Sequence, residues 1–218
     1  MDFLKEHAWA FYIIKGVEVT LEYSVLSVIF GLVIGAVIAL FRMSSYIPLK
    51  LFATFYISVI RGTPLLLQLS IVYFAIPGIL GYRVSPFLAG IIAFSINSSA
   101  YIAEIVRAGI LAVDKGQFEA AAVLKIPYLD MMKDIILPQA FRNMLPALVN
   151  ECSTLIKESS LIAIIGEADL MRRAQIIAAE QYTYFEPLLV AGACYYILVL
   201  ILNHFANRLE GSLNARYK

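Results

Sequence analysis

The sequence predicts an all-α integral membrane protein that crosses the bilayer five times as a single domain. Hydrophobic residues make up 61% of the 218 residues and the mean hydropathy is +0.81, so the chain holds more apolar surface than a soluble core of this length can bury. Five apolar stretches are also long enough to cross about 30 Å of hydrocarbon at about 1.5 Å per residue. The predicted spans are residues 21–41, 51–79, 87–110, 139–165 and 187–205, with a polar loop at residues 111–138.

The segment before the first span, residues 1–20, mixes charged and aromatic residues. It lacks the basic region and short apolar core of a cleavable signal peptide. Trp9, Phe11 and Tyr12 are residue types that favour the membrane interface. We therefore expect this segment to lie flat on the membrane before the first span begins.

The second span is interrupted by Arg61, Gly62, Thr63 and Pro64. Proline removes a backbone donor and clashes with the preceding turn, so the helix should kink or thin at this point. A packed kink, in which Arg61 reaches the membrane interface or a glutamate, would explain these residues.

The third span carries Asn97, Tyr101 and Glu104 at positions i, i+4 and i+7, so the three share one helix face. We treat them as candidate substrate-binding residues. Arg107 follows Glu104 by three residues and could neutralise it in an i, i+3 pair, which is the simpler explanation of that carboxylate.

The fourth span contains Glu151, Lys157 and Glu158, each of which costs roughly 2.5 to 3.5 kcal/mol near the centre of a membrane helix. Its apolar residues return only about 0.3 to 0.6 kcal/mol each, so this helix must face protein or a water-filled cavity. Glu151 and Glu158 are seven residues apart and share one face, which makes them candidate substrate-binding residues. The structural alternative is an ion pair between Lys157 and a carboxylate on another helix.

The basic residues of the connections favour an N-terminus outside and a C-terminus inside the cell. Eight lie on the side of the 111–138 loop and five on the other side, so we expect this loop to face the cytoplasm. The polar connection at residues 167–186 is then external and could contact a partner protein. The eight are Arg42, Lys50, Lys115, Lys125, Lys133, Arg208, Arg216 and Lys218, and the five are Lys5, Lys15, Arg83, Arg172 and Arg173.

Several functions are disfavoured by what the sequence lacks. There is no GxxxxGK[ST] phosphate loop, so we do not expect the chain to be its own ATPase. There is no HExxH or GxSxG motif and no Cys or His cluster at metal-ligand spacing, so we predict no enzyme, metal site or cofactor in this chain. A net charge of +1 without a basic run gives no field for nucleic acid.

The polar loop contains its own short helices. Glu119, Ala120 and Ala121 open the first, and alanine combines the best helix propensity with a side chain small enough for a groove of another protein. After thirteen further residues, a segment that ends in Leu137 and Pro138 closes the loop. A solvated amphipathic helix is the simpler explanation of such a stretch, but this spacing resembles the cytoplasmic EAA loop of ATP-binding-cassette (ABC) importer permeases.

Two further stretches are similar to the polar amino acid branch of those permeases. They are residues 101–110 (YIAEIVRAGI) and residues 157–161 (KESSL), and the resemblance covers nearly the whole chain. The resemblance implies the type I permease fold. It also implies that residues 61–64, which match the family's Arg-Gly-Thr-Pro signature, form a hinge in a moving helix.

By the same resemblance, the chain is the transmembrane subunit of an ATP-driven importer of a polar amino acid in a bacterial-type cytoplasmic (inner) membrane. A separate ATPase dimer would bind ATP and Mg, a second permease copy or homologue would complete the path among the lipids, and an extracytoplasmic solute-binding protein would deliver the cargo. The two carboxylates of the fourth span favour a cationic or strongly polar amino acid. The residues that would couple to the ATPase are Glu119, Ala120, Ala121, Lys125, Leu137 and Pro138.

The alternative is an ion-coupled secondary transporter that uses Glu104, Glu151 and Glu158 as a proton relay. Five spans without an inverted repeat argue against it. In either class, five spans alone would leave intramembrane polar groups exposed along one side, so we expect a dimer.

Lys125 departs from the family pattern. A glycine usually stands six residues after the glutamate, where a left-handed turn ends the first helix, and a residue with a Cβ in that conformation costs on the order of 1 kcal/mol. We therefore expect the turn to rely on Pro127 instead.

Overall fold

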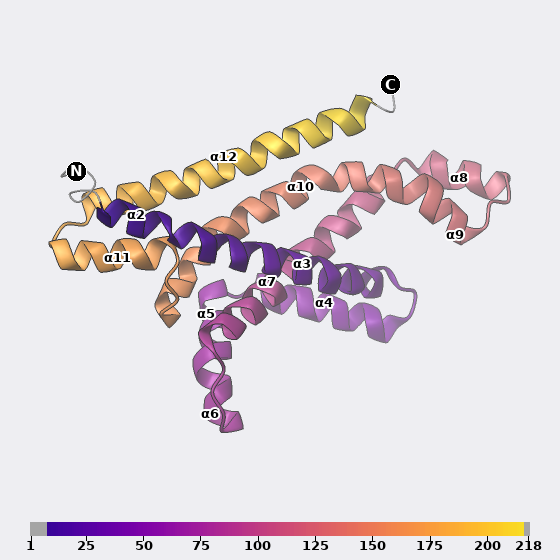
Figure 1. The fold of residues 1–218 in the computed structure, drawn as a ribbon. Coiled ribbons are helices and arrows are strands. Elements are labelled where there is room, and N and C mark those ends of the chain that lie inside the picture. The colour runs from indigo at the N-terminus through magenta and orange to yellow at the C-terminus, as the bar shows by residue number, and fades with distance from the viewer. Residues whose placement is uncertain (1–7, 216–218) are drawn as a thin grey trace.

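The computed structural model describes residues 8–215, and every regular element in that range is a helix (Figure 1). The predicted all-α architecture is confirmed. The boundaries of the helices differ from the predicted spans in ways that shape the functional site.

The first helix begins earlier than predicted. α2 (Ala8–Ile14) passes directly into α3 (Gly16–Met43), and together they form one helical stretch of 36 residues. The segment expected to lie flat is thus largely part of this helix. The physical reason is that Trp9 and Tyr12 pack into a hydrophobic cluster within the chain, while only Phe11, at 57% exposure, faces outward.

The predicted second span is divided into two parts. α4 (Ile47–Arg61) ends at the Arg-Gly-Thr-Pro segment, and α5 (Leu65–Ser70), a π-helical stretch (Ile71–Ala75) and α6 (Ile76–Leu80) follow after a bend of 99°. Pro64 adopts an extended conformation (φ −63°, ψ 138°) at the start of α5, so helical backbone cannot continue through it. The result is a sharp corner, and the second part points away from the remaining helices (Figure 1).

Three further long helices follow. α7 (Pro86–Leu111) and α10 (Leu137–Glu158) each start with a proline in the first turn, where no intrahelical donor is needed. α10 continues into a 3₁₀ helix (Ser159–Ile165), and α12 (Phe185–Ala215) is the last element described.

The polar connections are also helical. The predicted coupling loop contains α8 (Lys115–Val123), α9 (Tyr128–Asp130) and a π-helical stretch (Met131–Ile136). The connection before α12 folds as α11 (Leu170–Gln181), which packs against α12 and α2. α8 and α9 lie at the opposite end of the molecule from α2 and α11 (Figure 1).

Three helical stretches are long and apolar enough to cross a membrane: α2 with α3, α7, and α12. The bent pair is a fourth if it counts as one span. α10 is not among them, and it carries Arg142, Glu151, Lys157 and Glu158.

α7 lies at the centre and packs most extensively against α3. Two glycines of α3 permit this close approach, because a Cβ at Gly35 would lie 2.8 Å from the Ser99 carbonyl oxygen and one at Gly31 would lie 3.1 Å from Ser98 Cβ. α7 also contacts α4, α5 and α10, and it therefore connects all the elements that form the site.

Candidate functional site: a polar cavity and a projecting loop

A cavity of about 450 Å³ lies between α4, α7 and α10, beside the corner of the broken helix. Of the three candidates predicted on the third span, Tyr101 and Glu104 line it and Asn97 does not. The complete lining is Arg61, Tyr101, Glu104, Ile105, Ala108, Gly109, Ala112, Asn143, Met144 and Ala147.

Glu104 is held by two arginines. Its Oε2 accepts hydrogen bonds from Arg107 Nη2 at 2.8 Å and Nε at 3.1 Å, and Arg42 Nε lies 3.8 Å from Oε1. Arg42 also donates through Nη1 to Thr54 Oγ1 at 2.8 Å, so this cluster joins α3, α4 and α7. The expected i, i+3 pair with Arg107 is present. Glu104 therefore offers no unpaired negative charge to a ligand.

Arg61 ends α4 at the cavity and lies over the ring of Tyr101. The guanidinium carbon is 5.0 Å from the ring centroid, within the range of a cation–π interaction. Within residues 8–215 the exposed Arg61 makes no ion pair with a carboxylate. The Tyr101 ring thus takes the place of the glutamate that a packed kink would pair with Arg61. The edge of the Arg61 guanidinium remains available to an anionic group.

Asn97 faces the corner of the broken helix. It is 5% exposed, and its Nδ2 donates to Gln68 Oε1 at 3.1 Å. Gln68 Nε2 in turn donates to the Ile60 carbonyl at 2.8 Å, to the Thr63 carbonyl at 3.2 Å and to Thr63 Oγ1 at 3.0 Å. Gln68 was not among the residues predicted from the sequence, although a lone glutamine in the apolar run after Pro64 is a signal that could identify it.

Glu151, Lys157 and Glu158 of α10 make no ion pair within residues 8–215. Glu151 is half-buried and interacts electrostatically with Arg61 and Glu158, and Glu158 interacts with the exposed Lys157. The structural alternative of an ion pair between Lys157 and a carboxylate is not present within the described range, and neither glutamate is paired there. Glu151 therefore carries a carboxylate without an ion pair in this range, and neither Glu151 nor Glu158 lines the cavity.

A polar stripe runs along α10. Asn143, Asn150 and Lys157 follow one another at intervals of seven residues, and all three are exposed. Intervals of seven place residues on one helix face. Such a face is expensive in contact with lipid, so it needs water or another protein surface beside it.

The predicted coupling residues lie at the end of the molecule formed by α8 and α9. Glu119 and Ala120 are exposed, whereas Ala121 is 1% exposed and packs in a hydrophobic cluster that the loop shares with α7 and α10. Leu137 is exposed and Pro138 half-buried where α10 begins. Only part of the Glu-Ala-Ala segment is therefore free to touch another protein.

Four apolar side chains project from the tip of this loop. They flank the Ile126–Pro127 turn. They were not predicted from the sequence, although apolar pairs on both sides of a proline in a polar loop are a usable signal. They are Val123, Leu124, Tyr128 and Leu129, which are 81%, 71%, 68% and 78% exposed.

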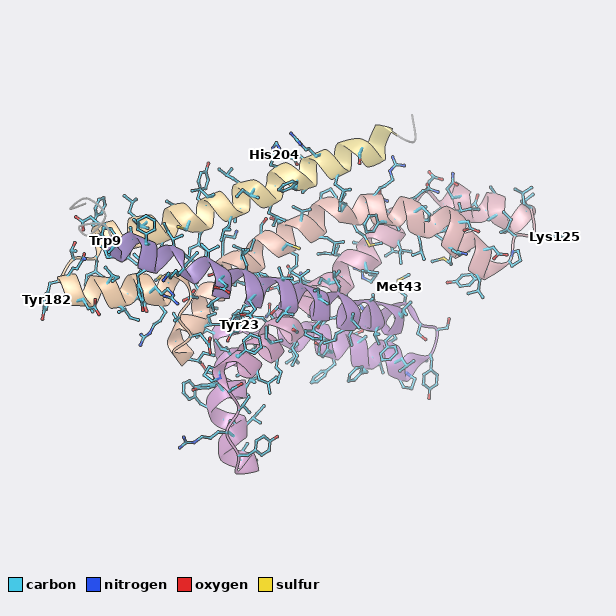
Figure 2. All side chains as sticks on the ribbon, viewed as in Figure 1. Trp9, Tyr23, Met43, Lys125, Tyr182 and His204 are labelled. Atoms are coloured by element: carbon cyan, nitrogen blue, oxygen red, sulfur yellow. The ribbon has the colours of Figure 1, made fainter. Side chains whose placement is uncertain are left out.

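Lys125 itself forms the left-handed turn, so the expectation that Pro127 would replace it is wrong. Its φ is 54°, its backbone N–H donates to the Ala122 carbonyl at 3.1 Å, and the Ile126 N–H donates to the Ala121 carbonyl at 3.0 Å. This is the Schellman pattern, in which two hydrogen bonds satisfy carbonyls that the helix end leaves free. The two bonds offset the cost of a left-handed lysine. Lys125 lies at the far tip of the loop (Figure 2).

At the other end of the molecule, α11 is anchored by Asp169. This residue is fully buried, and its carboxylate accepts from the Arg172 backbone N–H and from Tyr195 Oη, each at 2.8 Å. A Cβ at Gly16 would lie 2.5 Å from the Leu170 nitrogen, so the start of α3 packs directly on this turn. Burial raises the pKa of Asp169 above its ordinary value, although the hydrogen bonds from Arg172 and Tyr195 oppose the shift.

Comparison with known proteins gives a consistent result over the whole chain. Residues 31–218 match the sequence profile of the binding-protein-dependent transport system inner membrane component family. A Rickettsia conorii protein named "Putative glutamine transport system permease protein" is 56% identical over 207 residues, which is 95% of each chain. The arginine transport system permease protein of Bacillus subtilis is 50% identical over 204 residues, covering 94% of this chain and 93% of that one.

Solved structures share the fold. A crystal structure of an amino acid ABC transporter with histidines contains a chain that is 44% identical and superimposes with a TM-score of 0.90, covering 97% of this chain and 99% of that one. An inward-facing structure of the MetNI methionine ABC transporter, at 20% identity, shows the same fold with a TM-score of 0.76 over 93% of this chain and 96% of that one.

Proposed function

The chain belongs to the family of binding-protein-dependent transport system inner membrane components, and we propose that it imports a polar amino acid through the cavity between α4, α7 and α10. Membership makes it the permease of an amino acid ABC importer and confirms the resemblance of the chain to those permeases. It also overturns the alternative of an ion-coupled secondary transporter. The observation that carries this proposal is high identity over nearly the full length to permeases named for glutamine and for arginine.

The cargo is held by its two charged α-groups, the α-carboxylate and the α-ammonium group. The Arg61 guanidinium meets the α-carboxylate, because Arg61 lines the cavity and makes no ion pair within the described residues. Glu151 meets the α-ammonium group. It is not part of the cavity lining, but it lies one helical turn after Ala147, which is, and it makes no ion pair within the described residues. Glu104 keeps a structural role, since Arg107 and Arg42 neutralise it.

The side chain of the cargo meets polar groups. Asn143 and Tyr101 offer hydrogen-bonding groups at the cavity wall, which suit a polar side chain such as an amide or a guanidinium. Glu158 acts further along the path, and its interaction with Lys157 leaves it partly compensated. Asn97 is not a ligand of the cargo on this proposal, because its amide is used by Gln68.

The loop formed by α8 and α9 docks on a separate ATPase that binds ATP and Mg. This assignment is supported by the 44% identity to a chain of an amino acid ABC transporter and by the four exposed apolar side chains at the loop tip, because a cluster of exposed apolar side chains often marks a protein contact. Glu119 and Ala120 provide the polar rim of that contact. The loops of two permease copies approach each other when the ATPase dimer closes, and the helices then change access from outside to inside.

The remaining partners follow from the same arrangement. A second permease copy covers the polar stripe of α10, since that face is unsuitable for lipid. A solute-binding protein delivers cargo at the α11 end, which is external if the loop of α8 and α9 is cytoplasmic. This orientation puts the N-terminus on the external side of the inner membrane and the C-terminus on the cytoplasmic side.

The test is ATP-driven uptake by the reconstituted permease with its ATPase and solute-binding protein in lipid vesicles. Glutamine, arginine and histidine are offered separately, with a protonophore present to collapse any proton gradient. We expect accumulation of at least one of them that requires ATP and persists with the protonophore. Arg61→Gln should raise the half-saturating concentration at least tenfold, as expected for loss of a charge-assisted hydrogen bond. Absence of ATP-dependent uptake of all three would refute the proposal.

A further inference from the structure

We propose that Gln68 and Asn97 form a latch that fixes the corner of the broken helix and thereby positions the Arg61 guanidinium at the cavity. The effect of the latch on transport rests on the proposed function, whereas its effect on the corner does not. Neither residue lines the cavity, so both are positioning residues.

The corner leaves backbone carbonyls of α4 without partners inside the helix. The last carbonyls of a helix have no intrahelical partner, and Pro64 supplies no N–H. In a bilayer there is no water to replace these hydrogen bonds. Gln68 Nε2 donates to the carbonyls of Ile60 and Thr63, at 2.8 and 3.2 Å, and also to Thr63 Oγ1. One side-chain amide therefore satisfies two of the carbonyls at the corner.

Asn97 fixes the orientation of that amide. Its Nδ2 donates to Gln68 Oε1 at 3.1 Å, so the oxygen of Gln68 points to α7 and the nitrogen to the corner. A reversed Gln68 amide would turn its oxygen toward two carbonyl oxygens, which is repulsive, and would face the Asn97 amide with a second donor. Only one of the two amide orientations satisfies the whole network.

The latch connects the two elements whose side chains meet at the cavity. Ile60, which accepts from Gln68, directly precedes Arg61 on α4. Asn97 stands one turn before Tyr101 on α7, and Arg61 lies over the Tyr101 ring at 5.0 Å. A change in the corner therefore moves Arg61 relative to Tyr101.

A second contact holds α4 to α7 independently of the latch. Tyr56 Oη lies 2.6 Å from Ser99 Oγ and donates to the Ile96 carbonyl at 3.1 Å. Tyr56 lies more than one helical turn before the corner. Loss of the latch should therefore leave α4 docked and release only the corner and the helices that follow it.

The first test measures the corner in the full-length permease alone, in lipid nanodiscs. Cys152 and Cys194 are replaced by alanine, and spin labels are placed at Phe52 on α4 and Ile79 on α6, which are 51% and 82% exposed. Double electron–electron resonance then gives the distribution of distances between the two spin labels, and so across the bend. We expect Asn97→Ala and Gln68→Met each to broaden or shift this distribution.

Two matched variants serve as controls. Ser95→Ala removes another buried polar group from α7, but Ser95 Oγ has no hydrogen-bond partner within the described residues, so the distribution should not change. The exchange of Gln68→Asn with Asn97→Gln keeps the combined length and the donor and acceptor set, and should restore a narrow distribution. If Asn97→Ala fails to insert, Gln68→Met removes the latch from the other side.

The second test measures uptake by the reconstituted transporter. We expect Asn97→Ala and Gln68→Met to raise the half-saturating cargo concentration about five- to tenfold, which is the scale of one lost hydrogen bond. The maximal rate should change less than twofold, because a misplaced Arg61 weakens cargo binding and leaves the ATPase contact intact. Ser95→Ala should match the wild type in both quantities.

The outcomes separate the two proposals. An unchanged distance distribution in both latch variants overturns the latch. If the latch variants change the distance distribution but not the half-saturating cargo concentration, the positioning of Arg61 is overturned. It is also overturned if Ser95→Ala loses uptake to the same extent as the latch variants. A wild-type transporter without ATP-dependent amino acid uptake refutes the proposed function, while the distance measurement still decides whether the latch exists.

Discussion

Replacing Glu104 by glutamine tests the electrostatics of the cavity. The change keeps the shape of the side chain but removes the charge that neutralises Arg107 and Arg42, whose nitrogens lie 2.8 and 3.8 Å from its oxygens. Arg61 lines the cavity itself, so three guanidinium groups would then lie at or near the cavity without a paired carboxylate. At a distance of about 8 Å, one uncompensated charge acts on a second with about 2 kcal/mol at an effective dielectric of about 20 and about 0.5 kcal/mol in bulk water. These limits correspond to about 30-fold and about twofold in affinity.

We therefore expect Glu104→Gln to weaken uptake of a cationic amino acid about two- to 30-fold more than uptake of a neutral one. The assay is competition between arginine and glutamine in the same vesicles, which cancels differences in protein amount. Glu119→Gln is the control, because it removes a carboxylate from the exposed loop and should leave the ratio unchanged. Equal loss for both amino acids would show that Glu104 supports the fold and does not set the cavity potential. Because its side chain is 21% exposed, a stability loss of about 1 to 3 kcal/mol should accompany the change, between the values for exposed and buried pairs.

Three further results are expected. Lys125→Gly removes the strain of a left-handed residue at φ 54°, about 1 to 2 kcal/mol, but adds about 0.5 to 1 kcal/mol of conformational entropy to the unfolded chain. The backbone amide of the next residue should therefore exchange its hydrogen a few-fold more slowly. Tyr182→Gly, at φ 53°, should have the same effect at its own turn. Leu124→Asp should abolish co-purification of the ATPase without changing membrane insertion, and retained ATPase would contradict the docking assignment. Asp169→Asn should gain in thermal stability relative to the wild type as pH rises from about 4 to 7, because a raised folded pKa means that stability is lost as Asp169 ionises. A difference in melting temperature that stays constant with pH would contradict the burial argument.

Local interactions were predictable from the sequence. The pairing of Glu104 with Arg107 requires only helical spacing, and the position of the corner requires only the properties of Pro64. The all-helical architecture follows from five apolar stretches. The 99° angle does not, because it depends on how α5 packs against α7 rather than on the residues at the break.

Interactions between distant parts of the chain were not predictable. Asn97 meets Gln68 across 29 positions, and helical periodicity assigned Asn97 to a face shared with Tyr101 without any signal for that partner. Asp169 lies in a connection that was predicted only to be polar and external, because its burial comes from Tyr195 and the start of α3. Lys125 shows the reverse case: a local rule against a left-handed lysine was overridden by two backbone hydrogen bonds.

The unbroken run of α2 into α3 determines how the protein sits in the bilayer. Its 36 residues measure about 54 Å at about 1.5 Å per residue, against about 40 to 45 Å for a bilayer with its head groups. At the average tilt of about 20°, roughly 5 to 10 Å of helix still stands beyond the head groups. α11 packs beside α2 at this end, and Asp169 and Gly16 fix it in place. A protein that binds from that side therefore contacts a preformed surface made of two helices. No loop has to become ordered on binding, so binding carries no entropic cost of that kind.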